Sequence, residues 1–400
     1  MQTRVLVLGL DCLSPDLVGE WSAAGHLPNL KSLIDSGAFC PLGSTPHYSS
    51  GPAWMTFATG ANPGKHGIYA FMRRKRGAYE MEVSNFTQCP IPTMWEIISD
   101  AGGRSAVLNV PTVFPAPRIN GAAISGWLCP SLAHPGAVWP RDLREDLRQH
   151  AASYPFQTDI KRHRYAGRYE TAFRNVKDAI ETKTAVAQSL LKKGPWDLFT
   201  FVLVEGDAAQ HHFWHLHDPE AEEYDSALQS QHGDLVLETY KLLDESVGKV
   251  LASAGDVDMV IVMSDHGAML ERACFGFVRP ALEKMGLLRP RRSPAATLAR
   301  RGFLTLNTVL PKSIKSLLSD RFSGLRSKVQ AVGGLNDVRL SKSQVSTYYP
   351  EEHPSPSSAG IGFRSSGPIT RTVYSSAPAG GSRPRMSALG ARSRTSAPLC

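Results

Sequence analysis

Residues 4–11 read Arg-Val-Leu-Val-Leu-Gly-Leu-Asp, an apolar run that stops at a carboxylate. Similar runs occupy residues 198–204 and 257–263. Runs of this kind, without polar alternation, are typical of parallel strands that are buried on both faces. Each is followed by acidic residues: Asp11, then Glu205 with Asp207, then Asp265. Because ligands bind outside the carboxyl ends of the strands in an open α/β sheet, we expect these carboxylates to converge on one site.

Helical patterns separate the three runs. They cover residues 27–36, 93–102, 168–193 and 234–253. The alternation of strands and helices predicts an α/β fold with a mainly parallel central sheet. Residues 130–195 contain helices and loops without an obvious strand, and we interpret them as a helical insert that covers the site.

The composition is that of a folded globular protein, with 42% hydrophobic and 20% charged residues in a chain of 400. The net charge of +8 is unevenly distributed. Residues 289–400 contain 18 Lys and Arg against 4 Asp and Glu, whereas residues 1–288 contain 26 against 32. The basic third lacks interleaved aromatic residues and a recognised binding motif. We therefore expect a solvated basic segment, with no nucleic-acid partner and no membrane partner.

Cysteine usage and the N-terminal residues predict a reduced, cytoplasmic protein. The six cysteines are scattered without a C-x-x-C pair, which argues against a disulfide framework or a structural zinc site. The N-terminus, MQTRVLVLGLDC, has an apolar run too short for a signal peptide. No stretch approaches the roughly 20 apolar residues that a membrane helix needs.

A Ser-, Pro- and Arg-rich composition begins at residue 343. Residues 343–400 contain 13 Ser, 7 Pro and 6 Gly, and such a segment has few side chains to bury. We therefore expect a catalytic domain over residues 1–342 and a disordered tail over residues 343–400. A loop region that shields the substrate and an out-of-frame translation of a GC-rich gene are alternative explanations of this composition.

Two motifs at the ends of the expected strands carry metal-ligating residue types. Asp265 and His266 are adjacent in VMSDHG, where a turn lets both reach one cation that suits zinc or manganese. Asp207 and His211 are four residues apart, so a helix places them on one face. The alternatives are a turn aspartate beside a surface histidine, and a solvated helix end that also carries the following histidines: His212, His215 and His217.

Ser50 opens a third motif, Ser-Gly-Pro-Ala-Trp, in which Pro52 suits a first helical turn and Gly60 a helix end. A hydroxyl at a helix N-terminus meets free N–H groups and the positive end of the helix dipole, which also bind phosphate. Ser50 is therefore either a simple helix cap or a nucleophile. A cation at Asp11, Asp265 and His266 would favour the second role by stabilising the alkoxide.

The order of these motifs resembles the type I phosphodiesterase/nucleotide pyrophosphatase family of the alkaline phosphatase superfamily. The resemblance covers roughly residues 3–290. Besides the D-x-x-x-H motif followed by Phe-Trp and the SDHG motif, it rests on LGLD at 8–11, SGPAW at 50–54, TGANPGKHGI at 59–68, PTMWEI at 92–97 and NVPTVFPAPRINGAAISG at 109–126. It implies an alkaline-phosphatase-like three-layer α/β sandwich that acts on a small-molecule phosphate ester or nucleotide.

The resemblance also implies two divalent ions, zinc in preference to manganese. One would be held by Asp11, Asp265, His266 and the Ser50 oxygen, and the other by Asp207, His211 and a later histidine. Ser50 stands where the family has its nucleophile, and ions about 3.5–4 Å apart would activate it. The implied reaction is a double displacement through a phosphoseryl intermediate.

Several positions depart from the family pattern. His353 is the histidine that follows His266 in the sequence, so the last ligand of the second ion is either His353 or missing. Phe71 occupies the position of the asparagine that binds phosphate in eukaryotic relatives. Backbone N–H groups at Gly51, at Lys65 or at a residue of the insert are alternative phosphate partners. Lys65 and His66 are otherwise expected to be a loop cation and a packed histidine.

Three other functions share features with this pattern. Sulfatases share the fold, but the position of their motif arginine holds Trp54 here, which disfavours them. A phosphomutase of the same superfamily uses the same two-metal serine chemistry, with the insert acting as a lid. A C-terminally incomplete, inactive relative would bind metal without turnover.

Overall fold

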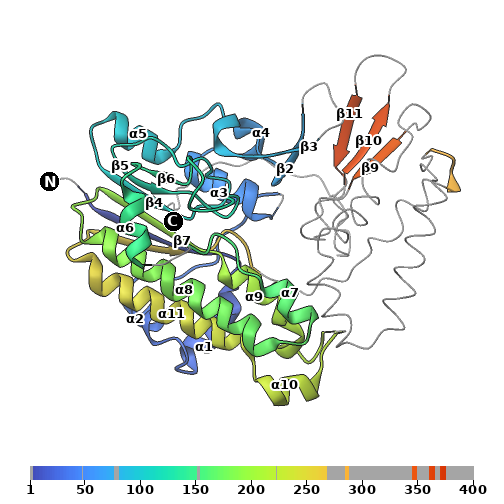
Figure 1. Ribbon diagram of the computed structural model, residues 1–400. Helices are drawn as coiled ribbons and strands as arrows, with labels where there is room; N and C mark the ends of the chain where they lie inside the picture. The colour runs from blue at the N-terminus through green and yellow to red at the C-terminus, as the bar shows by residue number, and fades with distance from the viewer. Residues whose placement is uncertain are drawn as a thin grey trace, which may run out of the picture.

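A six-stranded sheet forms the centre of the computed structural model (Figure 1). Its strands lie in the order β6-β5-β4-β7-β1-β8. Their bounds are Val5–Leu10 for β1, Ser105–Leu108 for β4, Gly121–Ile124 for β5, Val138–Trp139 for β6, Leu198–Leu203 for β7 and Met259–Met263 for β8. Neighbouring strands are parallel except for β5 with β6. The expected α/β fold with a mainly parallel sheet is therefore confirmed.

The structure describes residues 3–46, 48–75, 81–150, 154–221, 223–267 and 284–287, together with three C-terminal strands. These strands are β9 (Val345–Tyr348), β10 (Gly360–Arg364) and β11 (Thr370–Tyr374), and they pair as an antiparallel sheet. They fall within the segment expected to be a disordered tail. The rest of that segment, His353 included, lies outside the described residues, so the domain boundary at residue 342 stays a prediction.

Helices cover both faces of the central sheet (Figure 1). One face carries α1 (Pro15–Ala23), α2 (Pro28–Ser36), α8 (Tyr169–Leu191) and α11 (Leu235–Ala254), and α11 packs against α8 and α2. The other face carries α3 (Ser50–Thr59), α4 (Pro63–His66) and α5 (Met94–Asp100). The arrangement is the expected three-layer sandwich.

The remaining elements connect these layers. They are the hairpin of β2 (Met72–Arg74) and β3 (Met81–Val83), the 3-10 turns η1 (Phe86–Gln88) and η2 (Trp214–Leu216), and the helices α6 (Leu143–His150), α7 (Ile160–Tyr165), α9 (Glu205–Phe213) and α10 (Ser226–His232).

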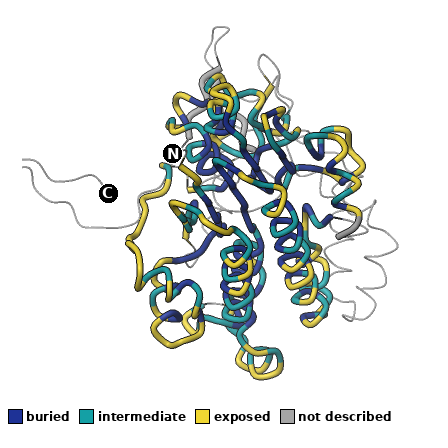
Figure 2. The backbone as a smooth tube through the Cα atoms, turned by 90° about the vertical axis from the view of Figure 1, so that its left-hand side faces the viewer, coloured by how far each residue is buried: buried dark blue, intermediate teal, exposed yellow. Residues whose placement is uncertain are grey.

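Strand β1 shows how the sequence builds two cores. Leu6, Leu8 and Leu10 alternate with Val7 and Gly9, and alternate residues of a strand face opposite sides of its sheet. The leucines pack in a cluster with residues of α8 and α11. Val7 packs with side chains of α3 and α5 in a second cluster. The strand is therefore buried on both faces, as the dark tube of the sheet shows in Figure 2.

The sequence pattern does not predict β4, β5 and β6. These strands have four, four and two residues, and β4 and β5 contain small residues instead of a long apolar run. Because β6 lies within residues 130–195, the expectation that this region lacks a strand is wrong. Helix α8, in the same region, packs against α11 and β7 and is therefore part of the central sandwich. Helix α7 packs against α9.

Candidate active site

The site lies at the carboxyl edge of three adjacent strands. In the sheet, β1 lies between β7 and β8, with Leu10 beside Leu203 and Gly9 beside Met263. Asp11 directly follows β1, and the segments after β7 and β8 carry Asp207 and Asp265. The predicted convergence of carboxylates at strand ends is therefore what the fold produces.

Ser50 lies at the first position of α3, with Ser49 as the N-cap residue. The sequence interpretation of Ser50 as the cap is wrong by one residue. The Ser50 side chain turns to the strand ends instead, where its Oγ donates to Asp11 Oδ1 at 3.1 Å. The same oxygen lies 3.0 Å from Nε2 of His266. A buried hydroxyl at a helix N-terminus is thus held between a carboxylate and an imidazole.

Trp54 fixes the other oxygen of Asp11. Its indole Nε1 donates to Asp11 Oδ2 at 2.9 Å, one turn of α3 after Ser50. A Cβ added to Gly9 would lie 2.3 Å from Cη2 of Trp54, so only a glycine in β1 lets the indole approach the strand. This role of Trp54 is not predicted from the sequence, where the residue is part of the SGPAW motif and disfavours a sulfatase.

His266 presents one ring nitrogen to the carboxylates. Its Nε2 lies 3.5 Å from Asp265 Oδ2 and 3.7 Å from Asp11 Oδ1. Its Nδ1 lies 3.1 Å from the carbonyl oxygen of Gly267. When Nδ1 carries the proton, it donates to this carbonyl and Nε2 is an acceptor. Histidines that bind metals are commonly oriented by a hydrogen bond of this kind from the other ring nitrogen.

Asp207 and His211 lie one turn apart on α9, with Asp207 Oδ1 3.3 Å from His211 Nε2. Asp207 also forms a group with Cys12 and His266, whose candidate ligand atoms lie within 4.8 Å of one another. A second such group contains Asp11, Asp265 and His266. The structure thus places all six residues expected for the site in one connected cluster, which holds Asp11, Ser50, Asp207, His211, Asp265 and His266.

Buried negative charge dominates this cluster. Burial is the largest effect that raises the pKa of Asp11 well above its usual range, and the carboxylates of Asp265 and Asp207 raise it further. His266 and the hydrogen bond from Trp54 lower it. Burial, then Asp207, raise the pKa of Asp265 to about 7. Among the described residues none donates a hydrogen bond to Asp265 Oδ2, whose side chain is 0% exposed. Carboxylates and an imidazole in this arrangement fit a divalent cation, which would neutralise the charge and coordinate the unpartnered oxygen.

Lys65 and His66 lie apart from these contacts. Lys65 is exposed, and His66 is buried with its Nε2 3.0 Å from Thr56 Oγ1 and its Nδ1 accepting from the Ile68 N–H at 3.1 Å. Burial lowers the pKa of His66. The interpretation of His66 as a packed histidine is confirmed, whereas Lys65, expected to be a loop cation, is an exposed cation within the short helix α4.

Phe71 passes beside the start of α3. A Cβ added to Gly51 would lie 3.3 Å from the backbone nitrogen of Phe71, and the Phe71 ring contacts Trp127 edge-on at 4.9 Å. The position expected to replace the phosphate-binding asparagine is therefore next to Ser50, and it carries an apolar ring.

The histidines after α9 are not a solvated helix end. His215 is 6% exposed, and its Nε2 lies 3.0 Å from the hydroxyl of Tyr169. Nδ1 of His217 lies 2.7 Å from Asp234 Oδ2, and its ring contacts Trp21 and Trp214 edge-on. Both side chains hold the end of α9 in the fold.

Glu205, two residues before Asp207, has a buried partner that the sequence does not reveal. Lys183 Nζ on α8 donates to Glu205 Oε1 at 2.6 Å, and the two side chains are 2% and 1% exposed. The apolar spacing of α8 gives no signal for a buried lysine. The pair fixes the start of α9 to the helix beneath it.

Residues 5–353 match the family model described as type I phosphodiesterase / nucleotide pyrophosphatase. Among solved structures, phosphonoacetate hydrolase from Sinorhizobium meliloti 1021 is similar in complexes with phosphonoformate and with phosphonoacetate. The identities are 17% and 18%, the TM-score is 0.46 for both, and the matches cover 72% and 73% of this chain but 64% and 66% of those chains.

Murine ectonucleotide pyrophosphatase / phosphodiesterase 5 is similar at 15% identity and a TM-score of 0.39, over 66% of this chain and 57% of that one. The match therefore spans less than two thirds of each of these solved chains. None of the curated proteins compared with the chain matches it. In the part of the chain that the structure describes, no helix combines the length and the apolar character needed to cross a bilayer.

Proposed function

Because the chain belongs to the type I phosphodiesterase/nucleotide pyrophosphatase family, we propose that it is a metal-dependent hydrolase of small-molecule phosphate esters or nucleotides, with Ser50 as its nucleophile. The observation that carries this proposal is the position of the Ser50 hydroxyl, 3.1 Å from Asp11 and 3.0 Å from His266 at the start of α3. A serine that only capped the helix would instead bond to the backbone of the first turn.

Two divalent cations, zinc in preference to manganese, complete the proposed site. Asp11, Asp265, His266 and Ser50 would hold one, and Asp207 with His211 would hold the other. When bound, such ions favour the alkoxide form of a serine and offset the charge of a phosphoryl group. His353 remains the family-based expectation for a further ligand.

The residues of the chain divide the proposed chemistry between them. Asp11 Oδ1 accepts the hydrogen bond of the Ser50 hydroxyl and so aims its oxygen. The Ser50 hydroxyl loses its proton to solvent, and its Oγ–P bond forms as the bond from phosphorus to the ester oxygen breaks. The ester oxygen leaves with the electron pair and takes a proton from water. At the start of α3 the backbone N–H of Gly51 would be available to the phosphoryl oxygens, because Pro52 has no N–H and the Ala53 N–H donates to the Ser49 carbonyl. Water then cleaves the phosphoseryl bond and restores Ser50.

Hydrolysis of bis-p-nitrophenyl phosphate by the zinc-loaded chain tests the proposal. We expect Ser50→Ala to lower kcat by about 1000-fold or more, because the residue forms the covalent bond. Ser49→Ala is the matched control, since Ser49 precedes the helix and makes no capping hydrogen bond through its side chain. Equal turnover by Ser50→Ala and the wild-type chain would show that Ser50 is not the nucleophile.

The same site supports phosphoryl transfer to a second hydroxyl, as in a phosphomutase. Comparing release of inorganic phosphate with turnover of a sugar phosphate to its isomer separates the two reactions. Hydrolysis predicts one phosphate released for each monoester consumed, whereas a mutase forms the isomer with little free phosphate. A chain that binds metal and does neither would be an inactive relative.

A further inference from the structure

Cys12 occupies a backbone position that ordinarily favours glycine. It directly follows Asp11, and its φ of 66° lies in the left-handed region, where a side chain costs roughly 1 kcal/mol or more. The residue is 4% exposed. Its thiol is therefore held in a fixed place at the end of β1, inside the candidate site.

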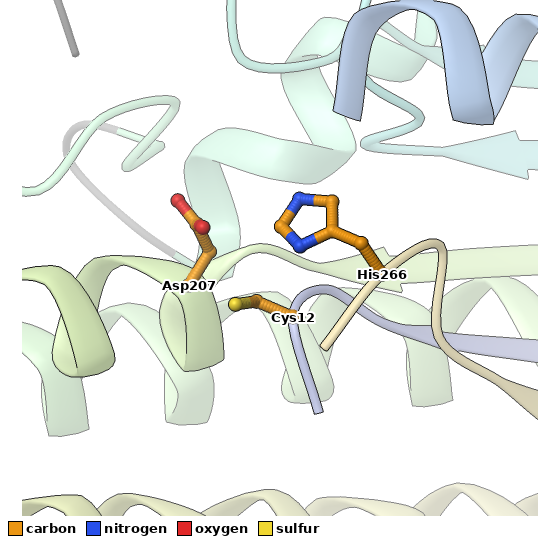
Figure 3. Close-up of side chains that lie close together, drawn as sticks. All are labelled: Cys12, Asp207 and His266. Atoms are coloured by element: carbon orange, nitrogen blue, oxygen red, sulfur yellow. The ribbon is translucent and has the colours of Figure 1, made fainter. Parts of the chain in front are cut away.

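Three different ligand types converge at this thiol (Figure 3). Cys12 Sγ, a carboxylate oxygen of Asp207 and a ring nitrogen of His266 all lie within 4.8 Å of one another. They come from the loop after β1, from α9 and from the loop after β8, so the fold alone brings them together. Thiolate, imidazole and carboxylate are the ligand types that zinc takes in proteins.

An independent observation in the same cluster points to a cation. Asp265 Oδ2 is buried without a hydrogen-bond donor among the described residues, and it lies 3.5 Å from the same Nε2 of His266. A buried carboxylate oxygen normally has a partner, and leaving it without one is costly. His266 is thus near both this unpartnered oxygen and the pair of Cys12 and Asp207.

We propose that the Cys12 thiolate is a protein ligand of the cation that Asp207 holds. The inference rests on the proposed function, and it adds a ligand beyond the aspartates and histidines named above. As the sulfur–metal bond forms, the thiol loses its proton to solvent. A sulfur ligand makes the site selective for soft or borderline cations such as zinc and disfavours manganese and magnesium.

Cobalt(II) titration of the metal-free full-length chain tests the inference by absorption. Bands in the visible region report any bound cobalt, whereas a thiolate-to-cobalt charge-transfer band in the near ultraviolet reports sulfur ligation. We expect both in the wild-type chain. In Cys12→Gly the charge-transfer band should disappear, while cobalt binding persists with an affinity lower by about 10-fold or more. Glycine suits the positive φ, so this variant should keep its fold.

Cys129→Ala is the matched control, because Cys129 is equally buried at 1% exposed and belongs to neither candidate metal group. It should keep the charge-transfer band. Visible cobalt bands without charge transfer in the wild-type chain would overturn the role of Cys12 and leave the proposed metal-dependent function intact. Absence of every cobalt band would overturn both. The wild-type spectrum decides between these outcomes even if a variant fails to fold.

Discussion

Asp11 is held by both of its carboxylate oxygens. Oδ1 accepts from Ser50 and Oδ2 accepts from the indole of Trp54, which lies behind it on α3. The tryptophan, which is fully buried, therefore sets the orientation of the carboxylate. The ring of Trp54 packs in the core, whereas its N–H group holds the carboxylate of Asp11. A variant that keeps an aromatic ring and removes the N–H group therefore separates the two contributions.

Trp54→Phe should lower both kcat and zinc affinity by about 10- to 100-fold, as expected when a group that orients a metal ligand is removed. The matched control is Trp95→Phe. Trp95 is buried in the same core cluster, but its Nε1 has no hydrogen-bond partner among the described residues. Zinc titration and turnover measured on both variants check the prediction, which fails if the two variants behave alike.

The pKa of Asp265 predicts the pH dependence of stability without metal. Burial, then Asp207, raise this pKa from 3.8 to about 7, so the folded state binds the proton more tightly than the unfolded state does. The free energy of unfolding of the metal-free chain should therefore fall as pH rises from about 4 to about 7, and Asp11, whose pKa is also raised well above its usual range, should add to the fall.

Urea denaturation at several pH values measures this slope. Asp265→Asn should flatten it, since the amide does not titrate, whereas Asp16→Asn, at an exposed position in α1, should leave it unchanged. Saturating zinc should also flatten it, because a cation stabilises the charged carboxylate. A metal-free chain whose stability rises over this pH range would contradict the prediction.

Residues at strand ends were predictable from the sequence, and residues that support them were not. Asp11, Asp207 and Asp265 each follow an apolar run, and the pattern alone indicates one edge of a sheet. Trp54 and Lys183 act through contacts with residues 43 and 22 positions away. A lysine within a helical pattern is normally a solvent-exposed residue, so only the packing of α8 on the start of α9 reveals its role.

At the scale of elements, α9 is anchored at its start by Lys183 and Glu205. A buried ion pair that loses one member leaves a charge without compensation, at a cost of about 3–5 kcal/mol. Lys183→Met should destabilise the chain by that amount, whereas Lys183→Met with Glu205→Leu should recover most of the loss.

Lys177→Met on the same helix is the control for this pair. Lys177 lies 3.9 Å from Glu181 in an ion pair whose side chains are about half exposed, and such a pair contributes about 1 kcal/mol or less. Chemical denaturation of the four chains gives the comparison. Equal losses for Lys183→Met and Lys177→Met would mean that burial of the pair does not matter.

Short elements set the limit of what the pattern could predict. The helices α2, α5, α8 and α11 lie within a few residues of the expected ranges, and α8 and α11 have long runs of helical spacing. Strands β4 and β5 pair in the middle of the sheet with sequences such as Gly-Ala-Ala-Ile, which carry no distinctive period. Their positions are decided by the neighbouring strands.

For the whole molecule, the cluster of carboxylates should couple metal binding to stability. A cation that binds only the folded chain stabilises it by about 2.7 kcal/mol when its concentration is 100 times its Kd. We expect zinc to raise Tm and a chelator to lower it. Asp11→Asn should reduce the zinc-dependent rise, and Lys65→Ala, outside the cluster, should not. Thermal unfolding with and without zinc checks this.

The strand order has a consequence for how the chain matures on the ribosome. Strand β1 is the first to be synthesised, yet its two sheet neighbours, β7 and β8, are the last of the six strands in sequence. During vectorial synthesis the apolar segment 5–10 therefore lacks both pairing partners until Leu203 has been added, and lacks β8 until Met263 has been added. A nascent polypeptide of this topology gives chaperones a long interval in which to shield its first strand.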